Sequence, residues 1–340
     1  MCFLFCNFGG EKSENKMDRR NFVQAGVASL ALAGMNSLSV FGKDEKATGG
    51  FGPVTCENVA GGEGDLRMRF LGTGAAGWRA GSTRERRNSS ILLDGKVLID
   101  LTKSVLDTIP EGCHPEHLFY THSHNDHYQP QQALALGVKN VYVSETWVDR
   151  AKGDFMQEAK KLNLPLPRFV TLKVGTPISV EGLVITPLPA NHTTNFYEEQ
   201  AQIYLVEKGT TPEHLGVRLL YATDTSGIMG KASRLAGIDE HRSEIPPRPI
   251  TAFVMEATMG VDGDEDFRIF NHSAPNTVAR IARVLTRTKR YTPPAGQPVY
   301  LTHMSNALHG HLPQDELNRI LPLPLRAAYD GLDVVLRAMP

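Results

Sequence analysis

Four side chains that commonly bind metal ions lie within six consecutive residues, directly after a short apolar run. They are His122, His124, Asp126 and His127. Imidazole nitrogens and carboxylate oxygens suit Zn²⁺ or a similar cation. Alternation at the end of a strand would point the first two histidines to one side, and the other two residues would follow in the turn. Groups crowded in this way have little structural use without a cation, so the segment predicts a metal site.

The spacing H-x-H-x-D-H differs from the helical H-E-x-x-H motif, which places two histidines one turn apart. A strand-end loop of this kind has enough ligands to serve two neighbouring metals. The alternative for any single histidine is an ordinary surface or hydrogen-bonded core residue, and that alternative fits four clustered groups poorly.

Composition indicates a globular protein with no bias towards a charged partner. The chain has 340 residues, 41% hydrophobic and 21% charged, with a formal net charge of -1. This length can bury a substantial core, and no second domain or internal repeat is visible. The charge balance gives no reason to expect nucleic-acid or membrane-surface binding.

The N-terminal region resembles an export signal. Arg19 and Arg20 precede an apolar run over residues 23–41, a pattern typical of twin-arginine (Tat) signals. A transmembrane anchor is the alternative, but this run is too polar for a stable span. We therefore predict a leader at residues 1–42, with Met17 as a possible start, a flexible linker at 43–65 and a single domain at 66–340. The expected location is periplasmic.

The four cysteines form no C-x-x-C pair. Removal of the leader would leave Cys56 and Cys113, which could pair in an oxidising compartment. Two free thiols are equally compatible with the sequence.

Further candidate ligands follow later predicted strands. His192 comes after the strand expected at residues 183–188, Asp224 after 218–222 and His303 after 299–302. Other strands are expected at 66–71, 90–93, 96–100, 118–121, 141–143, 169–174, 203–207 and 252–255. Helices are expected at 104–109, 131–136, 145–162, 276–285 and 314–320. Two packed sheets with helices outside would gather these strand ends along one edge.

A glycine-rich turn and a basic loop follow the first strand. Residues 72–77 read G-T-G-A-A-G without a following helix, so we interpret them as a tight turn and not as a dinucleotide motif. Arg79 and Arg87 lie in the basic loop, which is either a solvated surface or an anion-binding rim. His309 is either part of the substrate mouth or a surface histidine.

Together these residues resemble the metallo-β-lactamase superfamily. The seven candidate ligands are in that family's order, and residues 70–76, 87–90 and 301–305 resemble the branch that contains tRNase Z and a cyclic phosphodiesterase of phosphonate metabolism. The resemblance covers about residues 66–312 and implies an α+β fold, a four-layer αββα sandwich. It also implies two divalent cations, with zinc as the first choice and manganese or iron as alternatives.

The resemblance assigns the ligands to two metals. His122, His124 and His192 would hold one cation, Asp126, His127 and His303 the other, and Asp224 would bridge them. A hydroxide between two such cations would attack a phosphoryl group.

Two features depart from tRNase Z. Met255 stands where that family has a histidine before Glu-Ala-Thr, and no tRNA-gripping arm is evident. His272 is similar in context to the family's His-Ser-Thr element and is predicted, with Asp126, to be catalytic.

The predicted function is therefore an exported dinuclear hydrolase of a small or cyclic phosphodiester. Its substrate would be a small anionic molecule, without nucleic acid or a stable membrane span, and the protein could be a homodimer. The alternatives are lactone or carboxylic-ester hydrolysis on the same site, a flavodiiron-like redox role, or non-catalytic metal binding. A carboxylate would replace His124 in flavodiiron relatives, and non-catalytic relatives usually lack ligands.

Overall fold

The computed structural model describes residues 62, 64–239 and 246–340. All of them belong to one compact unit. The predicted leader and nearly all of the predicted linker lie outside the described residues. Among the described residues, no helix is long and apolar enough to cross a membrane.

The first of two sheets is built mainly from the N-terminal half of the described chain. Its strands are β1 (Leu66–Gly72), β2 (Ser90–Leu93), β3 (Val97–Ile99), β4 (His117–Phe119), β5 (Asn140–Ser144), β6 (Arg168–Leu172) and β14 (Asp333–Leu336). They are ordered β14-β1-β2-β3-β4-β5-β6. Strands β3 to β6 are parallel, so their carboxyl ends lie at one edge.

The second sheet contains the remaining strands. They are β7 (Ile178–Val180), β8 (Leu183–Pro189), β9 (Gln202–Lys208), β10 (Val217–Ala222), β11 (Ala252–Glu256), β12 (Val299–Thr302) and β13 (Leu325–Ala327). They are ordered β13-β12-β11-β10-β9-β8-β7. Strands β10 to β13 are parallel, and β8 runs in the same direction as β10 because both are antiparallel to β9.

An apolar core joins the facing sides of the two sheets. Phe70 and Phe119 from the first sheet and Tyr204 and Val254 from the second belong to one cluster of buried side chains. Alternation explains this arrangement, because every second residue of each strand points to the same face.

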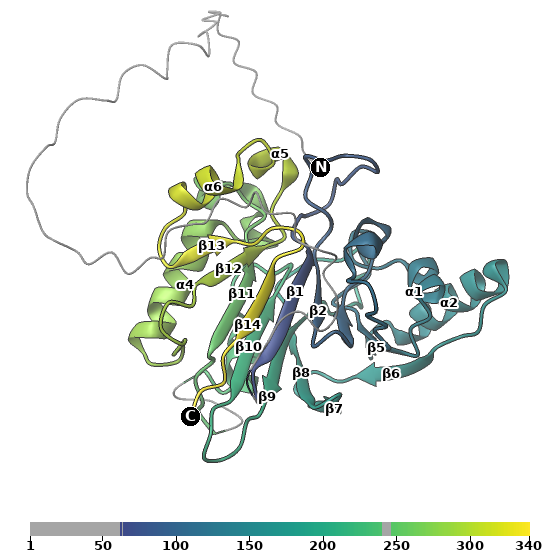
Figure 1. Cartoon of the computed structure of the whole chain (residues 1–340), viewed down its shortest axis with the longest axis horizontal. Coiled ribbons are helices and arrows are strands. Elements are labelled where there is room, and N and C mark those ends of the chain that lie inside the picture. Colours follow the sequence, from purple (N-terminus) through teal and green to yellow (C-terminus); the bar gives the residue numbers. More distant parts are fainter. Residues whose placement is uncertain (1–61, 63, 240–245) are drawn as a thin grey trace, which may run out of the picture. The chain divides into compact units, whose positions relative to one another are not determined.

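Helices cover the outer faces of both sheets. A 3-10 helix (η1, Lys103–Thr108), α1 (Pro130–Leu136) and α2 (Val148–Leu162) pack on the first sheet. The second sheet is covered by α3 (Gly230–Leu235), α4 (Pro275–Arg287) and α6 (Gln314–Ile320). Figure 1 shows α4 and α6 on the side of the sheets opposite to α1 and α2. The layers are therefore α, β, β and α.

The described part of the chain has three further short helices: the 3-10 helices η2 (Gly263–Glu265) and η3 (Phe267–Phe270), and α5 (Asn306–His309). Helix α4 begins at Pro275, whose fixed φ suits the first turn of a helix. Cys113 is buried and disulfide-bonded. The alternative of two free thiols is therefore wrong for Cys113. Cys56, the partner that the sequence allows, lies outside the described residues, so its pairing with Cys113 stays a hypothesis.

Candidate metal centre

The seven predicted ligands come together at one edge of the two sheets. His122, His124, Asp126 and His127 follow β4, and the other three follow strands of the second sheet. These three are His192 after β8, Asp224 after β10 and His303 after β12. The four strands carry their ligands at their carboxyl ends, and sheet packing brings these ends together.

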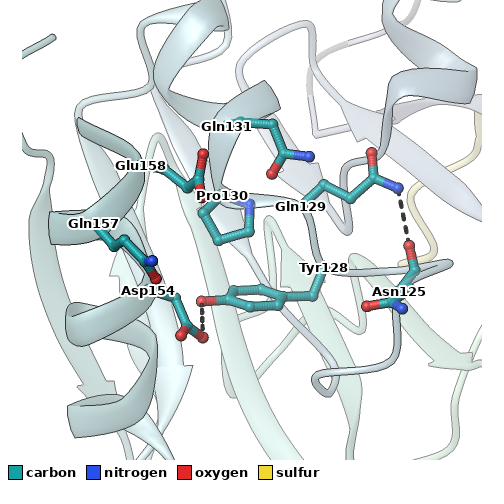
Figure 2. A pocket seen from close by; sticks show the side chains of 8 residues that line it. All are labelled: Asn125, Tyr128, Gln129, Pro130, Gln131, Asp154, Gln157 and Glu158. Carbon is teal, nitrogen blue, oxygen red and sulfur yellow. Dashed lines mark hydrogen bonds between the residues drawn. The ribbon is translucent and has the colours of Figure 1, made fainter. Parts of the chain in front are cut away.

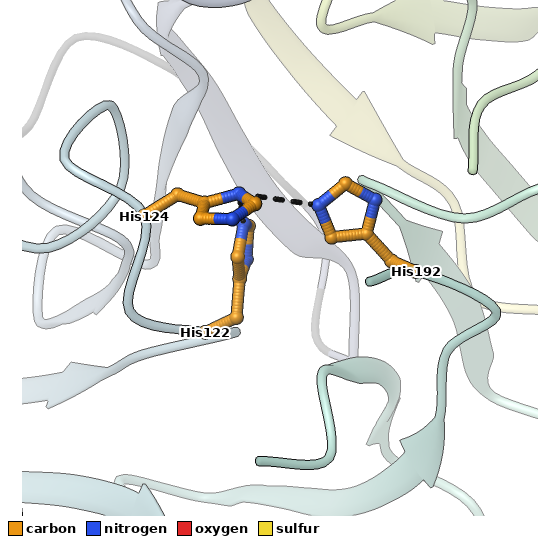
Figure 3. Close-up of side chains that lie close together, drawn as sticks. All are labelled: His122, His124 and His192. Carbon is orange, nitrogen blue, oxygen red and sulfur yellow. Dashed lines mark hydrogen bonds between the residues drawn. The ribbon is translucent and has the colours of Figure 1, made fainter. Parts of the chain in front are cut away.

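Three imidazoles form the first group. His122 Nε2 lies 3.0 Å from His124 Nδ1, which lies 3.2 Å from His192 Nε2. Figure 3 shows the three rings converging. Two nitrogens bound tetrahedrally to zinc, with bonds of roughly 2.0–2.1 Å, would be about 3.3 Å apart. The group therefore fits a cation of this size.

The second group consists of two imidazoles and a carboxylate. His127 Nε2 and His303 Nε2 lie 3.2 Å apart. Asp126 Oδ2 lies 3.5 Å from the first of these nitrogens and 3.4 Å from the second. These separations also suit one cation held between the three side chains.

Asp224 lies between the two groups. Its Oδ2 is 2.9 Å from His127 Nε2 and 3.2 Å from His303 Nε2. Its Oδ1 faces the other group, 3.6 Å from His192 Nε2. One oxygen of the carboxylate is thus available to each group, as a bridging ligand requires.

Burial and charge divide the histidines into two kinds. Burial lowers the pKa of His122 well below its usual value, and it also lowers the pKa of His124 and His192. These rings are neutral at pH 7, the form that binds metal. Burial alone would also lower the pKa of His127, but three nearby carboxylates, Asp224 foremost, raise it well above the usual value. A cation bound there would replace that proton.

The carboxylates are ionised. Burial would raise the pKa of Asp126, but His127 and His303 hold it below its ordinary range. Burial opposes ionisation of Asp224 as well, and His303 and His127 together hold its pKa well below the usual value. Both side chains therefore offer the negative charge that a pair of divalent cations needs.

Buried hydrogen bonds orient two of the candidate ligands that follow β4. They involve Asp100, which follows β3, and Thr121, which follows β4. His127 Nδ1 lies 2.7 Å from Asp100 Oδ2. Thr121 Oγ1 donates to the same carboxylate at 2.8 Å and lies 3.0 Å from His122 Nδ1. Both Nδ1 atoms therefore donate. The Nε2 lone pair of His122 is directed at the centre, and the Nε2 of His127 would be free for a cation once its proton is released. Such partners fix the tautomer and ring orientation of metal-binding histidines.

The second sheet supplies a similar arrangement. Thr258 Oγ1 donates to Glu256 Oε2 at 2.5 Å and lies 2.8 Å from His303 Nδ1. His192 Nδ1 lies 3.2 Å from the carbonyl oxygen of Asn271. These contacts again place the donor at Nδ1 and leave Nε2 free for a cation.

His272 lies beside both groups. Its ring is stacked against that of His303, with centroids 5.7 Å apart, and lies 5.0 Å from that of His192. Its Nδ1 is 3.0 Å from Glu256 Oε1. Burial would lower the pKa of His272, but the Glu256 carboxylate outweighs this effect and raises it to about 9.

Tight backbone geometry shapes this edge. Asp100, Asp224 and His303 have φ values of 60°, 46° and 49°, a left-handed conformation that non-glycine residues seldom adopt and that concentrates at functional sites. Gly74 bridges to both Asn88 and Met304, and a Cβ there would lie 2.6 Å from the Arg86 carbonyl oxygen. The predicted glycine turn therefore packs directly against the His303 loop.

Comparison with known proteins supports the fold. No family model and no curated protein matches the chain by sequence. Among solved structures, a diphosphatase from the PhnP family matches with a TM-score of 0.55 and 21% identity, over 81% of this chain and 99% of that one. Zinc-bound PqqB from Methylobacterium extorquens matches with a TM-score of 0.56 and 16% identity, over 79% and 99% of the two chains. A long-form RNase Z from yeast matches with a TM-score of 0.52 and 16% identity, over 82% of this chain and 42% of that one.

The chain has the metallo-β-lactamase fold. The expected αββα sandwich is confirmed by the two facing sheets, the outer helices and these neighbours. Met255, the position that departs from tRNase Z, is fully buried in the core beneath the outer helices.

The predicted substrate contacts of the metallo-β-lactamase domain need correction. The guanidinium group of Arg87 donates to Asp107 at 2.5 and 2.9 Å and to the Ser104 carbonyl, so it anchors the basic loop to η1 and is not free for an anion. His309 is 1% exposed, so its ring does not line an open substrate mouth.

Arg79 remains at the surface. Its Nε donates to Glu85 at 2.7 Å, and its side chain is 81% exposed. With Arg84, Ser305 and Asn306 it lines a cavity of about 580 Å³. Ser305 follows His303 by two residues, so this cavity adjoins the second ligand group.

A second cavity of about 460 Å³ lies beside the metal loop, between that loop and α2. Figure 2 shows Tyr128 at its centre, donating to Asp154, and Asn125 at its rim. It lies next to the candidate ligands without containing one.

Several site residues escaped the sequence analysis. Asp100 is the last residue of a predicted strand. The candidate ligands were identified because they follow predicted strands, so the same criterion could have identified Asp100. Glu256 and Thr258 belong to the Glu-Ala-Thr triplet, whose hydrogen bonds to His272 and His303 depend on contacts far apart in sequence. Glu199, which contacts the metal loop, carries no local signal.

Proposed function

We propose that this protein is an exported, dinuclear metal-dependent hydrolase that cleaves small or cyclic phosphodiesters. The observation that carries the proposal is the position of Asp224 between two complete ligand groups. Because neither group lacks a side chain and the bridging carboxylate is ionised, the centre is equipped for two cations. Zinc is the first choice, because imidazole-rich sites suit it and the neighbour PqqB is described as zinc-bound.

Two bound cations would activate water near neutral pH and stabilise charge on the attacked phosphoryl group. His122, His124 and His192 would hold one of them, and Asp126, His127 and His303 the other. The remaining side chains of the site then act on the substrate and its protons.

The pair of His272 and Glu256 is suited to the leaving group. Glu256 accepts from Nδ1 of His272, which fixes the ring and stabilises its protonated form. The ring lies against His192 and His303, one ligand from each group, so a proton on it is within reach of a substrate held at the centre. Delivery of that proton to the departing oxygen is general acid catalysis.

Asp126 would serve the attacking side. Its carboxylate is 16% exposed, whereas that of Asp224 is 4% exposed. It can therefore accept a hydrogen bond from the attacking water and orient it while it contributes to the second ligand group.

The substrate class is argued from charge and from the neighbours. Arg79 and Arg84 line the cavity beside the His303 loop. The guanidinium group of Arg79 is already paired with Glu85, so the argument for an anion rests on Arg84, because guanidinium groups match phosphate oxygens. Two neighbours are named as a diphosphatase and an RNase Z, and both names describe cleavage at phosphorus. The net charge of -1 gives no reason to expect nucleic acid as the substrate. Export rests on the twin-arginine leader, and a homodimer is compatible with the chain.

A substrate screen tests the proposal. The protein, loaded with zinc or manganese, is assayed on bis(p-nitrophenyl) phosphate, on cyclic phosphodiesters and on a lactone and ester panel. We expect hydrolysis of phosphodiesters that ceases in His122→Ala. Activity confined to lactones or esters would overturn the substrate class and leave the metal centre standing.

A further inference from the structure

We infer that Glu199 is a positioning residue of the metal centre, which sets the directions of His122 and His124 by binding the residue between them. The inference rests on the proposed function, because it assumes that these histidines bind metal. Glu199 precedes β9 and is not itself one of the candidate ligands.

Glu199 binds Ser123 through both of its carboxylate oxygens. Oε1 accepts from the Ser123 backbone N–H at 2.7 Å, and Oε2 accepts from Ser123 Oγ at 2.6 Å. The Glu199 side chain is 0% exposed. A buried carboxylate with two donors from one residue holds the backbone and the side-chain rotamer of that residue at the same time.

Ser123 is the only residue between His122 and His124, so its backbone determines how far apart the two rings point. The two residues before His122, Tyr120 and Thr121, are also held by residues of β9. Tyr204 Oη donates to the carbonyl of Tyr120 at 2.6 Å, and the Gln202 N–H donates to the carbonyl of Thr121 at 3.0 Å. The first half of the metal loop is thus docked along the start of β9, and Glu199 forms the contact nearest the ligands.

Arg150 completes the arrangement from α2. Its Nη2 donates to Glu199 Oε2, which balances the buried negative charge. The guanidinium carbon lies 3.5 Å from the centroid of the Phe196 ring and 5.4 Å from that of Trp147. Phe196 belongs to the loop that leads from His192 to Glu199. The same contact therefore joins the metal loop, the His192 loop and α2.

This arrangement matches what metal sites require of their surroundings. Groups that orient ligands commonly contribute 10- to 100-fold in metal affinity. Glu199 acts on backbone between two ligands, whereas Asp100 acts on a ligand ring, so the two residues constrain different degrees of freedom.

The test compares Glu199→Gln with Glu198→Gln, a matched change at the exposed neighbouring residue. In the first variant the amide N–H₂ takes the place either of Oε1, which accepts from the Ser123 N–H, or of Oε2, which accepts from Ser123 Oγ and Arg150 Nη2. In both orientations a donor N–H loses its acceptor. We expect zinc affinity, measured by competition with a chelator, to fall about 10- to 100-fold in Glu199→Gln and to stay unchanged in Glu198→Gln. The visible spectrum of the cobalt-substituted protein should shift only in the first, because the ligand geometry changes.

Ser123→Ala tests the same contact if Glu199→Gln does not fold. This variant removes one of the two contacts and leaves the buried ion pair intact, so we expect a weaker loss of zinc affinity and a smaller spectral shift. Wild-type affinity and spectrum in both Ser123→Ala and any folded Glu199→Gln protein would overturn the inference. A wild-type protein that binds no metal would instead contradict the proposed function, and with it this inference.

Discussion

Oδ2 of Asp224 lies 2.9 Å from Nε2 of His127, inside a centre where both side chains are almost completely buried. A carboxylate and an imidazole so placed form an ion pair while His127 is protonated. A bound cation would take the place of that proton, with the same two atoms as ligands. The strong pairing of charges thus indicates where the positive charge of a metal is needed.

Replacement of the bridging carboxylate should remove more than one ligand. In Asp224→Asn we expect fewer than two metal ions per chain and a kcat/KM at least about a hundredfold lower, because each lost cation removes several kcal/mol of charge stabilisation. Metal analysis by mass spectrometry and phosphodiesterase kinetics measure the two effects. Full metal content in this variant would show that Asp224 does not bridge.

Asp100 should matter for affinity without being a ligand. Its carboxylate accepts from His127 Nδ1 and from Thr121, so Asp100→Asn should weaken zinc binding about 10- to 100-fold. At saturating zinc most of the activity should return. A variant that stays inactive at saturating zinc would point to a direct role in the reaction.

His272 should affect turnover and leave the metals in place. As the proposed general acid, it should contribute roughly 10²- to 10⁴-fold, so His272→Ala should lower kcat by that factor with unchanged metal content. A substrate with a good leaving group, such as p-nitrophenolate, should be affected less than an alkyl phosphodiester. Loss of metal along with activity would make His272 a ligand instead.

His309 gives a prediction about stability and pH. Burial, with a contribution from Arg86, lowers the pKa of His309 from 6.5 to about 4. Between these values the unfolded chain binds the proton and the folded chain does not. Stability contributed by the neutral ring is therefore complete above pH 6.5 and is lost as the pH falls towards 4.

Replacement of this ring should reduce that loss. Neither ring nitrogen of His309 has a hydrogen-bond partner among the described residues, so His309→Leu removes unsatisfied polar atoms from the interior. We expect stability at pH 7.5 to be no lower than wild type, and an additional gain of about 1–2 kcal/mol at pH 5. Urea unfolding at both pH values measures this, and an equal effect at both would contradict the assigned pKa.

Local patterns were sufficient to predict the strands that carry the ligands. The predicted bounds of β2, β12 and α6 agree with the structure, and β1 and β8 differ by one residue. The short strands β7, β13 and β14 were not predicted as strands. β14 pairs with β1 from the opposite end of the domain, a pairing that no local pattern indicates.

The candidate site was predicted in part, because some of its residues follow strands with a clear local pattern. His192, Asp224 and His303 follow recognisable strands, so their meeting at one edge could be inferred. The fate of Arg87 depends on Asp107, twenty residues further along the chain, and the burial of His309 depends on how α5 packs. Neither is encoded in a local pattern, and the same holds for Glu199.

The central claim is that this metallo-β-lactamase fold holds two metal ions between the described ligands. Anomalous X-ray scattering at the zinc edge, from crystals of the protein loaded with zinc, tests it most directly. The account predicts two peaks, one enclosed by His122, His124 and His192 and one by Asp126, His127 and His303, with Asp224 between them. No peak at this edge of the sheets, or a single peak that involves neither group, would contradict it.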